Sequence, residues 1–129
     1  MGNRNLLDTH TFLWFLAGNS ELSKTARHKI EEENSMNFIS IASIWEIAIK
    51  VSLGKLELNK PFHHILDELG KNGFEILPIT FEDTLFVSNL PFQHRDPFDR
   101  IIIAQAFTNK LTLISKDSQF ANYPIKLIW

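Results

Sequence analysis

Cysteine is the first absence, because the chain contains none. Disulfide bonds and thiolate metal sites are therefore excluded, which fits a reducing compartment. Long apolar runs are also missing: no stretch approaches the roughly 18 residues that a membrane span requires, and the N-terminal MGNRNLLDTH lacks the apolar segment of a signal peptide. We therefore expect a soluble, cytoplasmic protein.

An excess of positive charge is missing too. The 13 Lys and Arg residues stand against 15 Asp and Glu, which gives a formal net charge of -2 at pH 7. The chain thus lacks the overall basic signature of a nucleic-acid-binding protein, and any polyanion would have to be held locally or through a metal ion. No internal repeat or low-complexity linker is present, and 129 residues with 44% hydrophobic content suit a single domain over residues 1–129.

What is present is organised around the stretch HRDPFDRIIIAQAF, residues 94–107. Asp96 is a good N-cap, Pro97 suits the first helical position, and Asp99 falls at the third position, near the positive end of the helix dipole. The following apolar residues cover most of the helix circumference: Phe98, Ile101, Ile102, Ile103, Ala104 and Phe107. This pattern predicts a buried helix with two carboxylates at its tip.

The rest of the chain alternates between strand and helix patterns. Strands are expected at residues 5–7, 37–41, 74–77, 111–115 and 125–128. Helices are expected directly after Asp8, at 23–33, over SIASIWEIAIKVSLGKL up to Gly54, at 61–69 and at 80–88, in addition to the stretch above. Strands separated by helices predict a three-layer α/β fold with a parallel sheet of about five strands.

Four acids take related places in this pattern. Asp8 and Asp117 each follow a strand, while Glu46 and Asp99 lie near the starts of helices that strands feed. In parallel sheets, ligands collect outside the carboxyl ends of the strands, so these side chains are expected to converge there. Asp96 is a fifth candidate, and the sequence leaves open which of Asp96 and Asp99 lies nearer a ligand.

A cluster of four carboxylates has a chemical consequence. At separations of roughly 5 Å they would repel by about 3 kcal/mol per pair at an effective dielectric near 20. Either some are protonated or a hard divalent cation compensates them, and oxygen ligands favour Mg²⁺ or Mn²⁺ over zinc. Such an ion suits phosphodiester hydrolysis. Five cations lie close enough in sequence to reach phosphates: Lys50, Lys55, Arg95, Arg100 and Lys116.

Four segments, LLDTHTFLW, SIWEIAIKVSLGKLEL, HRDPFDRIIIAQA and LISKDSQF, together resemble the PIN-domain ribonucleases, and among them the VapC-type toxins of toxin–antitoxin pairs. The resemblance spans residues 6–120. It implies a metal-dependent endoribonuclease with Asp8, Glu46, Asp99 and Asp117 at the site, a homodimer, and a cognate antitoxin whose C-terminal segment occupies the acidic cleft. Many relatives carry aspartate where this chain has Gln119, so the resemblance supports a first metal ion better than a second.

Each candidate residue also has a simpler interpretation. Asp8 could be only an N-cap, Glu46 could form a surface ion pair with Lys50, and Asp117 could start a turn. The five histidines show no ligand spacing, so we expect no zinc site and interpret them as surface or internally hydrogen-bonded residues: His10, His28, His63, His64 and His94. The case for a metal site depends on all four acids together.

Two other functions remain open at this point. An aspartyl-phosphate phosphatase or receiver domain also places acids beyond parallel strands, although DTHTF has His10 where a second aspartate is expected. A catalytically inactive binding module, whose acidic pocket receives a basic peptide, would share every feature of the sequence described above.

Overall fold

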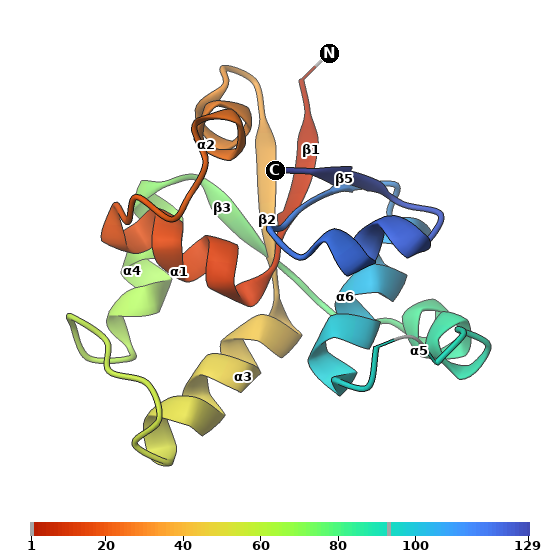
Figure 1. Cartoon of the computed structure of the whole chain (residues 1–129). Coiled ribbons are helices and arrows are strands. Elements are labelled where there is room, and N and C mark those ends of the chain that lie inside the picture. Colours follow the sequence, from red (N-terminus) through yellow and green to blue (C-terminus); the bar gives the residue numbers. More distant parts are fainter. Residues whose placement is uncertain (1, 93) are drawn as a thin grey trace.

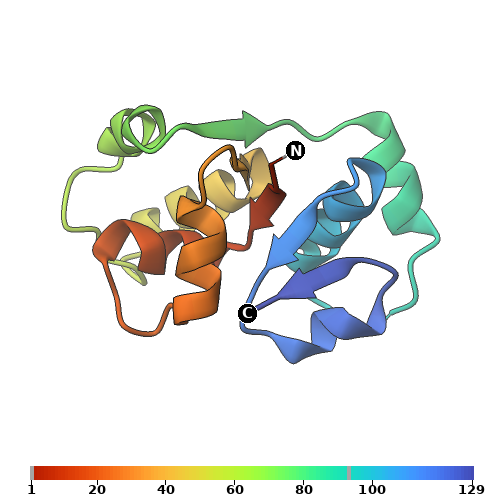
Figure 2. The same cartoon turned by 90° about the horizontal axis from the view of Figure 1, so that it is seen from above.

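A parallel five-stranded sheet forms the centre of the molecule. In the computed structural model, which describes residues 2–92 and 94–129, the strand order is β3-β2-β1-β4-β5 (Figures 1 and 2). The strands are β1 (Arg4–Leu7), β2 (Met36–Ser40), β3 (Phe74–Leu77), β4 (Thr112–Ile114) and β5 (Lys126–Ile128), and every neighbouring pair is parallel. The predicted α/β fold with about five parallel strands is confirmed.

Helices cover both faces of the sheet and complete three layers. They are α1 (Thr9–Ala17), α2 (Lys24–Glu31), α3 (Ile41–Ser52), α4 (His64–Lys71), α5 (Phe81–Ser88) and α6 (Pro97–Thr108), with a 3₁₀ turn η1 (Ser118–Asn122). Figure 1 shows α1, α2 and α4 on one side and α5 and α6 on the other. None of these helices, taken over the described residues, is long and apolar enough to cross a membrane.

Alternation along the strands builds the two cores. Leu7 packs with residues of α1, α2, α3 and α4, whereas its neighbour Leu6 packs with residues of α6 and η1. Successive side chains of a strand point to opposite faces, so one strand supplies both cores. Leu6 and Leu7 are both fully buried, which is why two apolar residues follow one another at the end of β1.

The helix boundaries differ from the sequence prediction in two places. The helix expected from residue 61 begins at His64, because Pro61 and Phe62 form a turn whose carbonyls accept hydrogen bonds from His64 and Ile65. The helix expected to reach about residue 33 stops at Glu31, and Asn34 then adopts a left-handed backbone with φ 68°. Local turns ended or delayed these helices although the apolar spacing continued.

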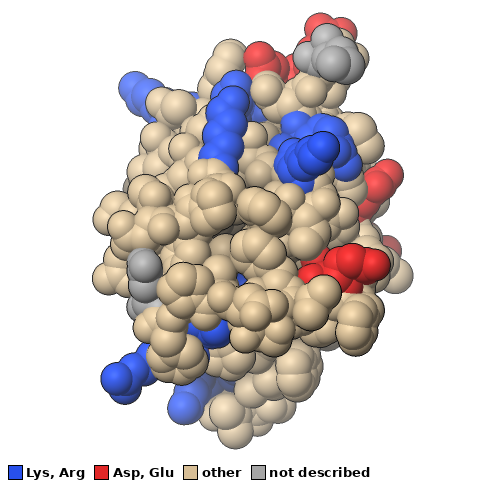
Figure 3. All heavy atoms as spheres, turned by 90° about the vertical axis from the view of Figure 1, so that its right-hand side faces the viewer, with Lys and Arg blue, Asp and Glu red and all other residues tan. Residues whose placement is uncertain are grey.

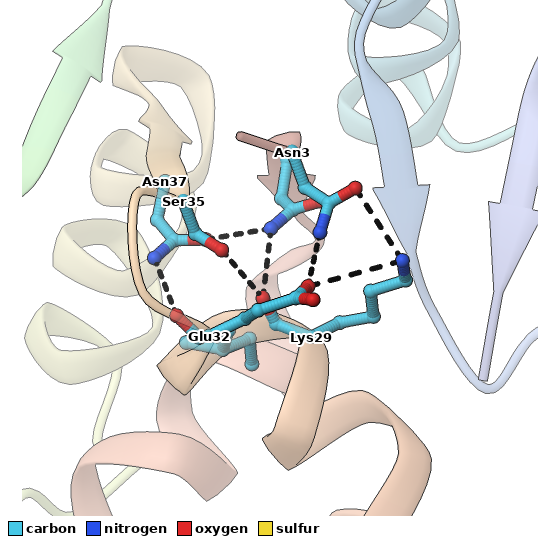
Figure 4. A network of polar contacts seen from close by, with 7 residues as sticks. Asn3, Lys29, Glu32, Ser35 and Asn37 are labelled. Carbon is cyan, nitrogen blue, oxygen red and sulfur yellow. Dashed lines mark hydrogen bonds and ion pairs between the residues drawn. The ribbon is translucent and has the colours of Figure 1, made fainter. Parts of the chain in front are cut away.

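A polar network closes the amino ends of β1 and β2. The buried side chains of Asn5 and Asn37 are joined by a 2.9 Å hydrogen bond, and each also donates to a carbonyl at the end of α2: Asn5 to Lys29 and Asn37 to Ile30. Ser35 donates to the same Lys29 carbonyl (Figure 4). Each such bond contributes about 1 kcal/mol. The network anchors α2 and satisfies the otherwise unpaired carbonyls at its end.

Candidate metal centre

The acids predicted from the sequence lie at the carboxyl ends of the strands. Asp8 follows β1 and caps α1, accepting a 2.9 Å hydrogen bond from the Thr11 amide. Asp117 follows β4 and caps η1. The starts of α3 and α6 approach this edge in Figure 1, since Ser40, the last residue of β2, is the N-cap of α3. Each carboxylate is thus held by a strand end or a helix start.

Asp99 is the electrostatic centre of the group. The pKa of its carboxyl group is raised to about 7, first by burial and then, in decreasing order, by the nearby charges of Asp96, Asp8, Glu46 and Asp117. All four other acids therefore act on Asp99 from close range. Within residues 2–92 and 94–129, no donor forms a hydrogen bond with the Asp99 carboxylate, whereas each of the other four accepts at least one. Asp99 is the acid that an added cation would satisfy.

A serine joins two of the acids. Ser115, the buried residue after β4, donates its hydroxyl hydrogen to Oδ2 of Asp8 at 2.5 Å, and Oγ of Ser115 accepts a hydrogen bond from the Asp117 amide at 3.1 Å. The Asp8 carboxylate is thus fixed at both oxygens, because Oδ1 is held by the start of α1. The sequence analysis missed Ser115; its position directly after a buried strand, beside a strand-end acid, was the available signal.

Glu46 is held in a comparable way. Its Oε1 accepts the Thr9 hydroxyl at 2.7 Å and its Oε2 pairs with Lys50 at 2.9 Å. The i, i+4 pair with Lys50 is therefore present, and Glu46 is nonetheless buried. Thr9, which follows Asp8 directly in sequence, links α1 to α3 and was also missed.

His94 lies beside the acids although its sequence spacing gave no indication of a site. Its ring is 6% exposed, with Nδ1 2.8 Å from the Tyr123 hydroxyl and Nε2 3.3 Å from Oδ2 of Asp117. One ligand atom each of His94, Asp99 and Asp117 lies within 4.8 Å of the others. In the described part of the chain no other group of three potential ligands is as close; Asp8 and Glu46 lie outside it.

The chemistry of this group fits a hard divalent cation. The predominant donors are carboxylate oxygens, the donor type that Mg²⁺ and Mn²⁺ prefer. Asp99 has a raised pKa and no hydrogen-bond donor, so a cation would both lower that pKa and neutralise the repulsion around it. Asp96 caps α6, its Oδ1 accepting the Phe98 amide at 2.8 Å, and it lies outside the group of three close ligand atoms.

Arg100 does not face this cluster as a phosphate ligand. Its buried guanidinium donates four hydrogen bonds of 3.2–3.3 Å to backbone carbonyls of the segment before α6: Val87, Leu90, Pro91 and His94. Phe92 covers the guanidinium at 4.7 Å. We therefore correct its expected role: Arg100 joins Val87, Leu90, Pro91 and His94 through their backbone carbonyls.

The other expected cations remain at the surface. Lys116 pairs with Glu21 at 3.0 Å and lies over the Trp14 ring at 5.9 Å. Arg95 and Lys55 are exposed. Arg95 precedes the acidic tip of α6 directly, and Lys116 precedes Asp117, so both chain positions border the cluster.

A groove of about 480 Å³ lies on another part of the surface. Its walls come from α1, from the segment 56–61 and from α4, and include His10, Trp14, Leu58, Pro61 and His64. None of the five acids lines it. The groove is therefore separate from the acidic cluster, although α1 borders both.

Comparison with known proteins gives one family. The family model of the PIN domain matches residues 6–126. Solved structures with a similar fold include VapBC2 from Rickettsia felis bound to a promoter DNA fragment (TM-score 0.73, 16% identity, 97% of each chain covered) and DNA-bound VapBC from Salmonella typhimurium (TM-score 0.71, 15% identity, 98% of this chain and 97% of that chain). A toxin–antitoxin complex from Klebsiella pneumoniae gives a TM-score of 0.66 at 20% identity, with 97% and 96% covered. Curated protein sequences give no match.

Proposed function

The chain belongs to the PIN-domain family, and from this premise we propose that it is an endoribonuclease dependent on Mg²⁺ or Mn²⁺ that acts in the cytoplasm as the toxin of a toxin–antitoxin pair. One observation carries the proposal: Asp99 is partly buried among four other carboxylates, with a pKa raised to about 7. Among the described residues nothing donates a hydrogen bond to it. A protein that only needed stability would gain nothing from this arrangement.

The residues divide into ligands and supports. Asp99, Asp117, Asp8 and Glu46 would hold the ion, while Asp96, which is exposed at the tip of α6, acts on Asp99 through its charge. When bound, such an ion supplies the positive charge that binds phosphate oxygens and activates water. The protein's own contribution is to keep the carboxylates in place, through Ser115, Thr9 and Lys50.

Phosphate groups of the RNA have cations available beside the acids. We propose that Lys50, Arg95 and Lys116 contact the RNA backbone, which would position the strand without reading its sequence. The present ion pairs of Lys50 and Lys116 with glutamates would then be exchanged for phosphate contacts.

The strand order decides against the receiver-domain alternative. Receiver domains have the order 2-1-3-4-5, in which β1 and β3 are neighbours. Here β1 lies between β2 and β4, and β3 is at the edge. The inactive binding module shares the observed fold and is separated from the enzyme by assay.

Cleavage of a structured RNA by the purified protein tests the proposal. We expect cleavage with Mg²⁺ or Mn²⁺, none with a chelator, and none by Asp99→Asn. Asp67→Asn is the matched control, because Asp67 is an exposed acid in the first turn of another helix, α4. Wild type that binds the ion but cleaves no RNA would favour the binding module, and cleavage of DNA in preference to RNA would overturn the substrate class.

An antitoxin partner is the second part of the proposal. The structures of similar fold include complexes described as toxin–antitoxin and VapBC. We propose that a cognate antitoxin places a basic C-terminal segment in the acidic cleft. Induced expression of the wild type should arrest growth, Asp99→Asn should not, and co-expression of a small neighbouring open reading frame should relieve the arrest. Growth arrest by both variants would contradict a toxic nuclease.

A homodimer is the third part, and α3 and α5 offer the surface. Ser40 pairs with Leu77, so the chain segments following β2 and β3 lie side by side. They expose apolar side chains: Ile41, Trp45 (61%), Ile79, Phe81 (77%) and Leu85. Figure 3, which looks from the side of α5 and α6 in Figure 1, shows residues without charge over much of this side, with Lys and Arg toward its upper and lower ends. We propose that a second copy of this chain covers these exposed apolar side chains.

A further inference from the structure

His94 occupies a position that the proposed chemistry does not yet use. Its two ring nitrogens face different partners: Nδ1 the Tyr123 hydroxyl at 2.8 Å and Nε2 the Asp117 carboxylate at 3.3 Å. A carboxylate only accepts, so the hydrogen must reside on Nε2. In a neutral ring with its hydrogen on Nε2, Nδ1 carries the lone pair and accepts the hydroxyl hydrogen of Tyr123. The three side chains form a directed chain from Tyr123 through His94 to Asp117.

His94 is also fixed by contacts that do not involve the acids. Its ring stacks on Phe120 at 4.8 Å between centroids, with 11° between the planes. Its backbone carbonyl accepts a 3.2 Å hydrogen bond from the buried guanidinium of Arg100. Phe120 and Tyr123 are both buried in the core on this face of the sheet. The imidazole is therefore a rigid support.

Asp117 needs such a support more than the other acids do. Its side chain is 41% exposed, and it caps only a short 3₁₀ turn through the Gln119 amide at 2.9 Å. That bond holds Oδ1, whereas Oδ2 is held by His94 alone among the residues that the structure describes. Without His94, rotation about the Asp117 side chain would carry Oδ2 away from Asp99.

We propose that His94 is a positioning residue: held by Tyr123 and Phe120, it fixes the Asp117 carboxylate for the ion, and this inference rests on the proposed metal-dependent function. A nitrogen that donates its hydrogen to Asp117 cannot offer a lone pair to a cation, so His94 is not a ligand. The ligand set is then made of oxygens only, which matches Mg²⁺ and Mn²⁺ rather than zinc.

Two amide substitutions of His94 separate the contribution of Nε2 from that of Nδ1. His94→Gln carries an N–H at about the place of Nε2, whereas the shorter His94→Asn reaches only the place of Nδ1. Mn²⁺ affinity, measured from the electron paramagnetic resonance signal of the free ion, should fall about tenfold in His94→Asn and recover largely in His94→Gln. Tyr123→Phe, which removes only the hydroxyl donor, should give an intermediate loss.

The Asp117→Asn background tests whether His94 acts through Asp117. We expect His94→Asn to weaken Mn²⁺ binding in the wild type and to add little in Asp117→Asn. Equal losses in both backgrounds, or an equal loss in His94→Gln and His94→Asn, would show that His94 is itself a ligand and would overturn the inference. Thermal unfolding of each metal-free variant checks folding, and if His94→Asn does not fold, Tyr123→Phe decides.

A metal-free measurement keeps this inference distinct from the proposed function. Long-range ¹H–¹⁵N correlation spectra of the wild type at neutral pH should show the His94 proton on Nε2. A lone pair at Nε2 would overturn the positioning role even if the protein binds Mn²⁺ and cleaves RNA. A wild type that binds no Mn²⁺ would instead refute the proposed metal site, while the tautomer still decides on the hydrogen bond.

Discussion

Replacing Asp99 by asparagine should stabilise the metal-free protein at neutral and alkaline pH while abolishing RNA cleavage. The substitution keeps the size of the side chain and removes a charge that four neighbouring carboxylates repel. It disrupts no hydrogen bond found within the described residues, because the Asp99 carboxylate accepts none there. Loss of activity together with a gain in stability would be the signature of a residue retained for chemistry.

The expected size follows from the pKa. The rise in the pKa of Asp99 from 3.8 to about 7 means that the folded protein destabilises the charged carboxylate by about 4 kcal/mol. Screening by the solvent that reaches Asp99 lowers this free-energy cost to about 1–2 kcal/mol. The folded state binds more protons than the unfolded state between these pKa values, so wild-type stability falls as pH rises through that window. The advantage of Asp99→Asn therefore grows from near zero below about pH 4 and levels off above about pH 7.

Thermal unfolding in the presence of a chelator measures the effect. At about pH 8 we expect Tm to be about 3–7 °C higher for Asp99→Asn than for wild type, with a smaller difference at about pH 5. Added Mg²⁺ should stabilise the wild type and close the gap, since an ion that binds only the folded state raises its stability. Asp67→Asn should show no comparable pH-dependent gain. An unchanged or lower Tm for Asp99→Asn at pH 8, or a difference independent of pH, would refute the reasoning.

Three further changes have defined outcomes. Ser115→Ala removes the donor to Asp8 and should weaken Mn²⁺ binding roughly tenfold, as seen by titration calorimetry; unchanged affinity would contradict a supporting role. Arg100→Lys cannot make the four carbonyl contacts and should lower the free energy of unfolding by about 3 kcal/mol. Urea unfolding with and without RNA measures this change. A loss of RNA affinity with wild-type stability would instead show that Arg100 binds phosphate. Phe81→Asp should convert a dimer into a monomer in sedimentation experiments, whereas Leu66→Asp, at a similarly exposed position on α4, should not; a monomeric wild type would refute the dimer surface.

The fold could be predicted because two periodicities in the sequence are strong. Adjacent apolar residues mark the buried ends of β1 and β4, and Asp96 and Pro97 mark the start of α6 as its N-cap and first residue. The start of α4 was predicted too early at Pro61, since a proline suits both the first position of a helix and a turn. Backbone hydrogen bonds stabilise the turn here, and the spacing of apolar residues in the sequence does not reveal them.

Of the candidate site, the sequence predicted only the residues whose location follows from the ends of the strands. The acids could be located because the carboxyl edge of a parallel sheet gathers whatever follows its strands. Their supports could not, since the bonds of Ser115 to Asp8 and of His94 to Asp117 join residues 107 and 23 positions apart. Arg100 was misassigned for the same reason: a charged residue beside an acidic tip suggested phosphate binding, and only the three-dimensional course of the 87–94 segment explains its burial.

The two ends of the sheet differ in how their buried polar groups are compensated. At the amino end, Asn5 and Asn37 donate to the last carbonyls of α2, so polar groups buried there contribute stability. At the carboxyl end, Ser115 donates a hydrogen bond to Asp8, and Nε2 of His94 lies 3.3 Å from Oδ2 of Asp117. A hydroxyl donor fixes a carboxylate and leaves its charge in place, whereas an arginine would neutralise it. Lys50 compensates only Glu46, and among the described residues no donor reaches Asp99. The negative charge that raises the pKa of Asp99 is therefore only partly compensated by the protein, and this is the physical basis of the proposed cation site.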